Sequence, residues 1–168
     1  MADPAAAADR DAAMLAARER ELTPGASARS VLKPLEDGVL HRDGDGALAP
    51  HAGAVGPQWR VGRGGRVGLF DDVVGTGFAL LTRGGLVAGP EVRARLDGLG
   101  ARYAHLVPAG AAADGPDDVV DVSGNYLTWL EELDAAAVLL RPDFYVFGAA
   151  GDAAGLAGLV ADLRARLG

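Results

Sequence analysis

Residues 137–148 read AVLLRPDFYVFG, a pattern that predicts two strands joined by a tight turn. The apolar run at 136–140 has the length of a buried strand, and residues 144–147 predict a second strand. Between them, Arg141-Pro142-Asp143 has the composition of a tight turn. Proline presets φ for a turn, and aspartate accepts hydrogen bonds from nearby backbone N–H groups. Two strands joined by so short a turn are expected to be antiparallel.

Outward from this hairpin, helices and strands alternate. Strands are predicted at 78–81 and 103–107, and helices at 90–99, at 126–133 and after a cap at Asp152. Trp129 belongs to a helical stripe that faces the core. The order is β-α-β-α-β-β-α, and the first two strands should be parallel because a helix joins them. The sequence therefore predicts an α/β, thioredoxin-like fold with a mixed four-stranded sheet and helices on both faces.

Three segments are expected: an N-terminal helix at 1–25, an irregular lead-in at 26–65 and the thioredoxin-like domain at 66–168. The first helix carries a thin apolar stripe that is mostly alanine, so we expect it to project from the core and contact another molecule. Glycine clusters at 43–46 and 62–65 predict turns. Neither completes a calcium loop or a dinucleotide fingerprint.

Composition excludes several chemistries. The chain has 168 residues, 49% of them hydrophobic, and contains no cysteine, so disulfides, thiol mechanisms and the redox chemistry of thioredoxins are excluded. Its three histidines do not have metal-site spacing. A net charge of −7 disfavours nucleic acid as a partner. No apolar run is long enough to span a membrane. We therefore expect a cytoplasmic protein without a metal, nucleic-acid or membrane partner.

Two segments resemble a specific family. GLFDDVVGTGFALL at 68–81 and AVLLRPDFYVFG at 137–148 are similar to the LLDDVLGxGFxLL and AVLVRPDxYVxG segments of flavin-dependent aromatic hydroxylases. GPQWRV at 56–61 resembles the PQxRV lead-in of that family. The subgroup it most resembles is that of the 3-(3-hydroxyphenyl)propionate and polyketide-ring hydroxylases. The resemblance implies the C-terminal thioredoxin-like domain of such an FAD-dependent monooxygenase.

The resemblance implies FAD and NAD(P)H as cofactors of the parent enzymes. The FAD-binding motifs of the family are not in these 168 residues, so no catalytic, cofactor-binding or metal-binding residue is assigned to this chain. The matching positions are interpreted as structural, with docking on a partner as the alternative: Asp71, Asp72, Gly75, Gly77, Phe78, Arg141, Pro142, Asp143, Tyr145 and Gly148.

Four side chains allow more than one interpretation. Arg141 either shapes its turn with Asp143 or binds a carboxylate of a ligand or partner domain. Asp71 and Asp72 are expected to cap a helical turn, with paired-carboxylate catalysis as the weaker alternative. A lone strand histidine such as His105 is expected to be satisfied or half-exposed. Trp59 is expected either to cover the domain or to contact a partner.

Three functions are considered. The leading hypothesis is a non-redox structural and association module of an FAD-dependent aromatic hydroxylase, which binds the FAD-binding domain and performs no chemistry alone. The alternative is a free-standing small-molecule-binding protein or accessory subunit of an aromatic or polyketide pathway, with its site between residues 83–90 and the turn at 141–143. The third is a homodimerisation module.

Overall fold

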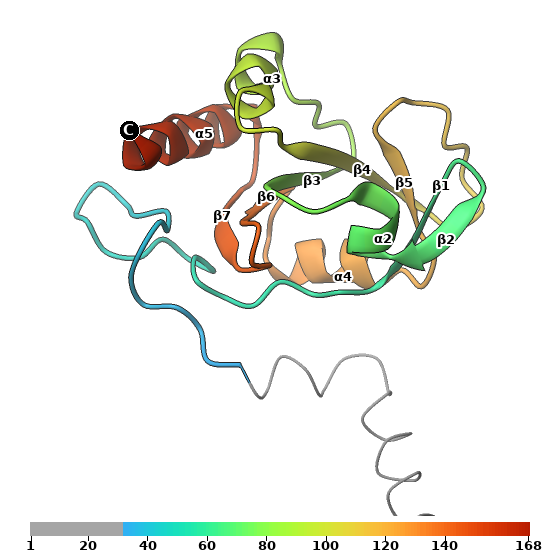
Figure 1. Cartoon of the computed structure of the whole chain (residues 1–168), viewed down its shortest axis with the longest axis horizontal. Coiled ribbons are helices and arrows are strands. Elements are labelled where there is room, and N and C mark those ends of the chain that lie inside the picture. Colours follow the sequence, from blue (N-terminus) through green and yellow to red (C-terminus); the bar gives the residue numbers. More distant parts are fainter. Residues whose placement is uncertain (1–31) are drawn as a thin grey trace, which may run out of the picture. The chain divides into compact units, whose positions relative to one another are not determined.

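The computed structural model describes residues 32–168. The expected helix at 1–25 and the first residues of the lead-in lie outside the described residues, so these expectations stay predictions. Contacts divide the chain into Met1–Lys33 and Pro34–Gly168. The description below concerns the second unit (Figure 1).

One sheet organises this unit. Its seven strands lie in the order β2-β1-β5-β4-β3-β6-β7. β3 is parallel to β4, and β4 is parallel to β5. β6 is antiparallel to both β3 and β7, and β1 is antiparallel to both β2 and β5. The strands are β1 (Arg60–Arg63), β2 (Arg66–Leu69), β3 (Ala79–Arg83), β4 (Arg102–Pro108), β5 (Asp118–Asp121), β6 (Ala137–Leu140) and β7 (Val146–Ala150).

The mixed α/β class is confirmed, and so are the directions expected within the first pair of strands and within the hairpin. The expectation of a four-stranded sheet is wrong, because β1, β2 and β5 extend it to seven strands. Each of these three strands has four residues, too few to show a clear alternation of polar and apolar side chains. β1 forms the end of the lead-in that was expected to be irregular. The thioredoxin-like assignment stays a prediction.

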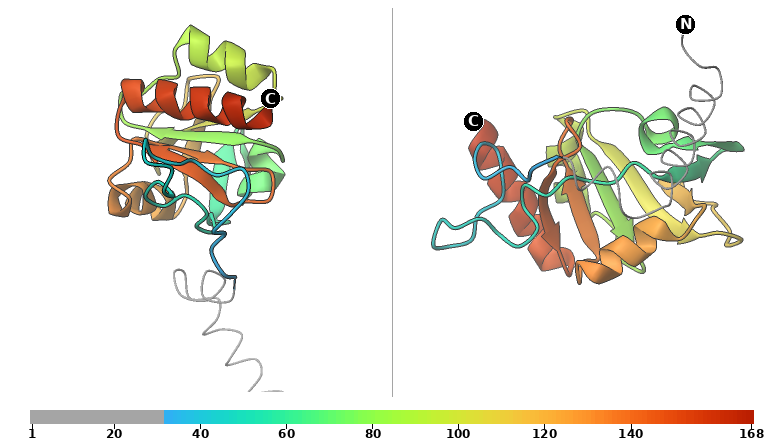
Figure 2. Two further views of the ribbon diagram at one scale, coloured as in Figure 1. Left: turned by 90° about the vertical axis from the view of Figure 1, so that its left-hand side faces the viewer. Right: turned by 90° about the horizontal axis from the view of Figure 1, so that it is seen from below.

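Within residues 32–168, four helices pack against the sheet: α2 (Phe70–Val74), α3 (Pro90–Asp97), α4 (Asn125–Glu132) and α5 (Ala153–Leu167). Figure 2 shows α3 and α5 on one face and α4 on the other. The predicted helix start at residue 90 and the predicted cap at Asp152 are both confirmed. Pro90 occupies the first turn of α3, and the Asp152 carboxylate accepts a hydrogen bond from the Gly155 N–H at 2.8 Å.

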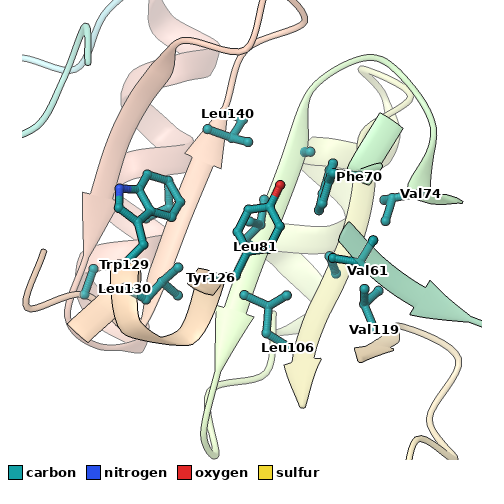
Figure 3. Close-up of a cluster of buried hydrophobic side chains, with 14 of the residues drawn as sticks. Val61, Phe70, Val74, Leu81, Leu106, Val119, Tyr126, Trp129, Leu130 and Leu140 are labelled. Atoms are coloured by element: carbon teal, nitrogen blue, oxygen red, sulfur yellow. The ribbon is translucent and has the colours of Figure 1, made fainter. Parts of the chain in front are cut away.

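An aromatic cluster fills the core beneath α4 (Figure 3). Trp129 is 1% exposed, as the helical stripe predicted. Trp59 packs edge-on against Tyr126 and Trp129, with ring centroids 5.1 and 6.4 Å apart. The Tyr126 hydroxyl donates a hydrogen bond to the Pro57 carbonyl at 2.9 Å. Trp59 therefore covers the domain, which was one of its two interpretations.

The lead-in lies along the β7 edge of the sheet. The N–H groups of His41 and Gly53 donate to the carbonyls of Phe147 and Val146, both at 2.9 Å. His41 Nδ1 also lies 2.7 Å from the Asp162 carboxylate of α5. Residues 34–59 thus cover one edge of the sheet, and β2 is the opposite edge.

We predict that Trp129→Ala lowers the free energy of unfolding by about 3–5 kcal/mol, because it removes a large aromatic side chain from the core. Urea denaturation followed by circular dichroism measures the change. Val87→Ala is the control, since Val87 is 69% exposed and its truncation should cost less than about 0.5 kcal/mol. A loss below about 1 kcal/mol for Trp129→Ala would show that the stripe does not support the core.

A second prediction concerns acid stability. Burial raises the pKa of Asp162, but hydrogen bonds from Arg166 and His41 outweigh burial and hold this pKa below its ordinary value of 3.8. Asp162 therefore stabilises the folded state above pH 3.8, and this contribution disappears as the pH falls through the lowered pKa. Urea denaturation at a series of pH values, from neutral pH to below the lowered pKa, measures the free energy of unfolding. This free energy should fall less steeply with decreasing pH in Asp162→Asn than in the wild type. If the pH dependence of the unfolding free energy were the same in both proteins, the stabilising role of ionised Asp162 would be contradicted. Asp114→Asn is the control, because Asp114 is exposed.

Candidate functional site

The structure joins the two family-like segments at one end of the sheet. β3 pairs with β6 so that Ala79 lies opposite Leu140. Phe78, which precedes β3, therefore lies beside the turn Arg141-Pro142-Asp143, which follows β6. Together with Val39 and Leu167 these residues line a cavity of about 290 Å³, here called the motif cavity. The motif cavity is therefore the first candidate for a binding role of the motif residues.

The Arg141 guanidinium is occupied within its own unit. Its Nε and Nη2 atoms donate to the two carboxylate oxygens of Asp143, at 3.1 and 2.7 Å. Its Nη1 donates to the Val39 carbonyl at 2.9 Å. A two-point bond of this kind uses the face that a guanidinium would offer to another carboxylate. The geometry favours the structural interpretation of Arg141 and Asp143.

The paired carboxylates Asp71 and Asp72 lie on α2, away from the motif cavity. They occupy the first turn of this helix, whose N-cap residue is Leu69, so the expectation that they cap it is wrong. Asp71 accepts a hydrogen bond from the N–H of Asp72 at 3.0 Å. Carboxylates in a first turn stabilise a helix through its dipole, which gives them a structural reason to be there.

Backbone conformation and close packing are the structural reasons for glycine at the motif positions. Gly75 and Gly77 have φ values of 103° and 118°, a region that side-chain-bearing residues rarely adopt. A Cβ atom on Gly148 would lie 2.5 Å from Leu159 Cδ1 and 2.8 Å from His41 Cβ. Tyr145 forms an antiparallel bridge with Val55 of the lead-in.

The cleft expected between residues 83–90 and the turn at 141–143 does not form. Thr82 pairs with Ala137, and Ala79 pairs with Leu140. Because β3 and β6 run in opposite directions, the segment after Arg83 and the turn after Leu140 lie at opposite ends of this strand pair. The small-molecule site that the alternative function placed between these two segments is therefore not present.

A different depression borders the 83–90 segment. It measures about 280 Å³ and is here called the polar cavity. Its floor is apolar, with Leu80, Leu86 and Ala104 among the lining residues. Sequence reasoning missed this site. Strand alternation placed Tyr103 and His105 on one face, but the loop at 115–118 that closes the cavity carried no signal. Its polar lining comprises Thr82, Arg93, Tyr103, His105, Asp117 and Asp118.

The polar groups of this cavity satisfy one another. The Arg93 guanidinium lies 4.2 Å from the Tyr103 ring centroid and forms an ion pair with Asp117. The Tyr103 hydroxyl donates to the Asp97 carboxylate at 2.7 Å. Burial raises the pKa of Tyr103, and the hydrogen bond to Asp97 raises it further, so the phenol stays protonated at neutral pH.

The His105 ring is held by a hydroxyl group. Its Nδ1 atom lies 3.0 Å from the Oγ1 atom of Thr82, a residue that is 7% exposed. This agrees with the expected satisfied histidine. A nucleophile–base–orienter arrangement needs a third polar group on the other ring nitrogen, and among the described residues no such bond is present.

Among residues 32–168, no group of three or more histidines, aspartates and glutamates is placed to hold a metal ion. Within the same residues, no helix is both long and apolar enough to cross a bilayer.

Comparison with known proteins gives consistent matches. Residues 53–166 match the family described as the HcaD C-terminal domain. A probable NADH-specific resorcinol 4-hydroxylase of Rhodococcus jostii (strain RHA1) is 34% identical over 175 residues, covering 98% of this chain and 29% of the relative. The 3-(3-hydroxy-phenyl)propionate/3-hydroxycinnamic acid hydroxylase 1 of Burkholderia vietnamiensis (strain G4 / LMG 22486) is 35% identical over 105 residues, covering 56% of this chain and 17% of the relative. The chain thus spans less than a third of the length of these hydroxylases.

One solved structure is similar in both fold and sequence. The flavin-dependent monooxygenase PieE, determined in complex with FAD and substrate, aligns with a TM-score of 0.55 and 28% identity. The alignment covers 92% of this chain and 29% of PieE.

We predict opposite effects for two glycine-to-alanine changes. Gly148→Ala should destabilise the fold by about 1–3 kcal/mol, because the new methyl group would overlap His41 and Leu159. Gly158→Ala is the matched control in α5, where a Cβ atom has no neighbour within 4 Å, and it should stabilise the fold by about 0.5–1 kcal/mol. Thermal and urea unfolding of the two variants measure whether each change lowers or raises the free energy of unfolding. Equal effects would show that the close contact at Gly148 does not constrain the motif.

Proposed function

Because this chain belongs to the HcaD C-terminal domain family, we propose that it is a structural and association module of a flavin-dependent aromatic-ring hydroxylase. In this proposal it performs no chemistry alone and associates with the FAD-binding part of the enzyme. The observation that carries the proposal is the share of each protein that the sequence match covers. The chain is matched almost end to end in a named hydroxylase of which it accounts for 29%, so most of that enzyme lies elsewhere.

The contacts of the motif residues support this role. Arg141 and Asp143 bind each other, and Gly148 permits the close packing of His41 and α5. These residues serve the fold. Side chains whose hydrogen bonds are made within the unit fit a structural role.

The starts of three described helices do not fit the pyrophosphate of FAD. A phosphate site at a helix start requires free N–H groups and no competing negative charge. α2 carries Asp71 and Asp72 in its first turn, and the N–H of Gly155 in α5 is already bonded to Asp152. α3 begins with Pro90, which has no N–H group. We therefore assign FAD and NAD(P)H to the remainder of the hydroxylase and derive no step of their chemistry here.

The polar cavity favours a second candidate function, an accessory protein that binds a small molecule. Its volume of about 280 Å³ is near the lower end of the range for ligand pockets. Its apolar floor and hydrogen-bonding rim are the usual composition of such pockets. This candidate ranks second because the polar groups of the rim already bond to one another.

Two measurements test the proposed function. We expect the purified chain to lack flavin absorption and to leave FAD fluorescence unchanged on titration. On gel filtration it should co-elute with the FAD-binding part of its own hydroxylase, and bovine serum albumin serves as the unrelated control. Stoichiometric FAD on the isolated chain would contradict the non-catalytic assignment. A failure to co-elute would contradict the association role.

A further inference from the structure

The two edges of the sheet differ in what covers them. The β7 edge is covered by the lead-in, which forms hydrogen bonds with Val146 and Phe147. On the opposite edge, β2 pairs only with β1 among the described strands. Its apolar side chains Val67 and Leu69 are 54% and 44% exposed. An open strand edge with apolar side chains is a template for pairing with another strand.

The hairpin geometry shows which backbone groups face this open edge. β1 and β2 are joined by a two-residue turn at Gly64 and Gly65, both with positive φ, and Arg63 pairs with Arg66. The residues that flank a two-residue turn exchange hydrogen bonds with each other, and the next pair does not. The N–H groups of Val67 and Leu69 and the Val67 carbonyl therefore point away from β1.

The segment that forms this edge is complementary to itself. It reads RVGLFDD at 66–72, with a cation at its start and two carboxylates at its end. In an antiparallel pair centred on Gly68, Val67 of each copy lies opposite Leu69 of the other. Arg66 then lies near the start of α2 of the second copy, where the chain leaves the strand and carries Asp71 and Asp72.

The faces of the strand agree with this arrangement. A Cβ atom on Gly68 would lie 3.3 Å from Val73 and 3.4 Å from Asp72, so Gly68 faces α2. Side chains two apart on a strand share a face, which places Arg66 on the α2 face as well. Cation and carboxylates are therefore on the same side, while Val67 and Leu69 lie together on the other.

We propose that β2 pairs antiparallel with β2 of a second copy of this chain, about a two-fold axis at Gly68. The contact joins the two sheets through the outward N–H and C=O groups, two Val67–Leu69 pairs and two ionic contacts from Arg66 to Asp72. The two copies use the same patch, so the assembly closes as a dimer. This goes beyond the proposed function, because it names a partner and a surface for the chain itself.

Charge supports a second copy as the occupant. Arg66 donates to the backbone carbonyl of Asp72 in its own chain at 3.2 Å, and neither residue belongs to an ion pair among the described residues. The chain as a whole has a net charge of −7, which opposes random self-association. A defined contact that joins opposite charges is the arrangement in which two such chains can meet, and salt should weaken it.

Sedimentation equilibrium of the full chain over a range of concentrations is the first test. We expect a reversible monomer–dimer equilibrium whose dissociation constant rises with salt. Hydrogen exchange at high and low protein concentration should show protection of Val67 and Leu69 only at high concentration. A monomer at every concentration would overturn the proposal, and so would a dimer in which these amides stay unprotected.

Charge reversal provides the sharper test. Arg66→Asp and Asp72→Arg should each raise the dissociation constant about tenfold, because each brings like charges together across the axis. The double variant should restore it, since both contacts are then reversed. Val67→Pro should also weaken the dimer, because it removes an N–H group that faces outward and leaves the β1–β2 ladder intact.

Two controls separate the dimer from other causes. Val87→Asp introduces a charge at an exposed valine outside β2 and should leave the dissociation constant unchanged. Circular dichroism of each variant verifies the fold. Failure of the double variant to recover would overturn the proposal. It would also be overturned if the amides of β2 became protected only when the FAD-binding part of the hydroxylase was added, and that result would leave the proposed function standing.

Discussion

β3 and β6 pair antiparallel, each with a further strand on its other side, and all four residues of β6 are buried. Because both faces of these strands are covered, the two strands can carry only apolar or internally bonded side chains. The helices α3 and α5 pack on one face, and α4 with its aromatic cluster packs on the other. The same pairing fixes which loops meet: Phe78 and the turn at 141–143 share one end, and the 83–90 loop lies at the other. This register places the motif cavity at one end of the strand pair and the 83–90 segment, which borders the polar cavity, at the other.

The fold was predictable where a local pattern determines an element. The stripe that contains Trp129, the cap at Asp152 and the hairpin at 137–147 are each coded within a few residues, and each is present. The last strand begins two residues later than expected, because Phe144 has a φ of 63° and belongs to the turn. β1, β2 and β5 could not be predicted from their own residues, because none of them has the continuous apolar run that marks β6, a strand of the same length.

The candidate site was less predictable than the fold. The ion pair between Arg93 and Asp117 joins a helix to a loop 24 positions away, a contact that depends on how the loop folds over β4. Arg141 shows the opposite case. Its partner Asp143 is two residues away, so the structural interpretation could be weighed from the sequence alone. Local bonds can be anticipated from composition, whereas a cavity assembled from three segments depends on the tertiary fold.

The acidic start of α2 links the site chemistry to the surface of the unit. Asp71 and Asp72 stabilise their helix through its dipole and, by the same charge, oppose a phosphate at that position. They also stand at the end of the segment that forms the open edge of the sheet, with Arg66 at its other end. A pair of carboxylates that would repel a nucleotide can therefore attract a cationic strand edge. This combination agrees with the proposed role of the chain in binding another polypeptide.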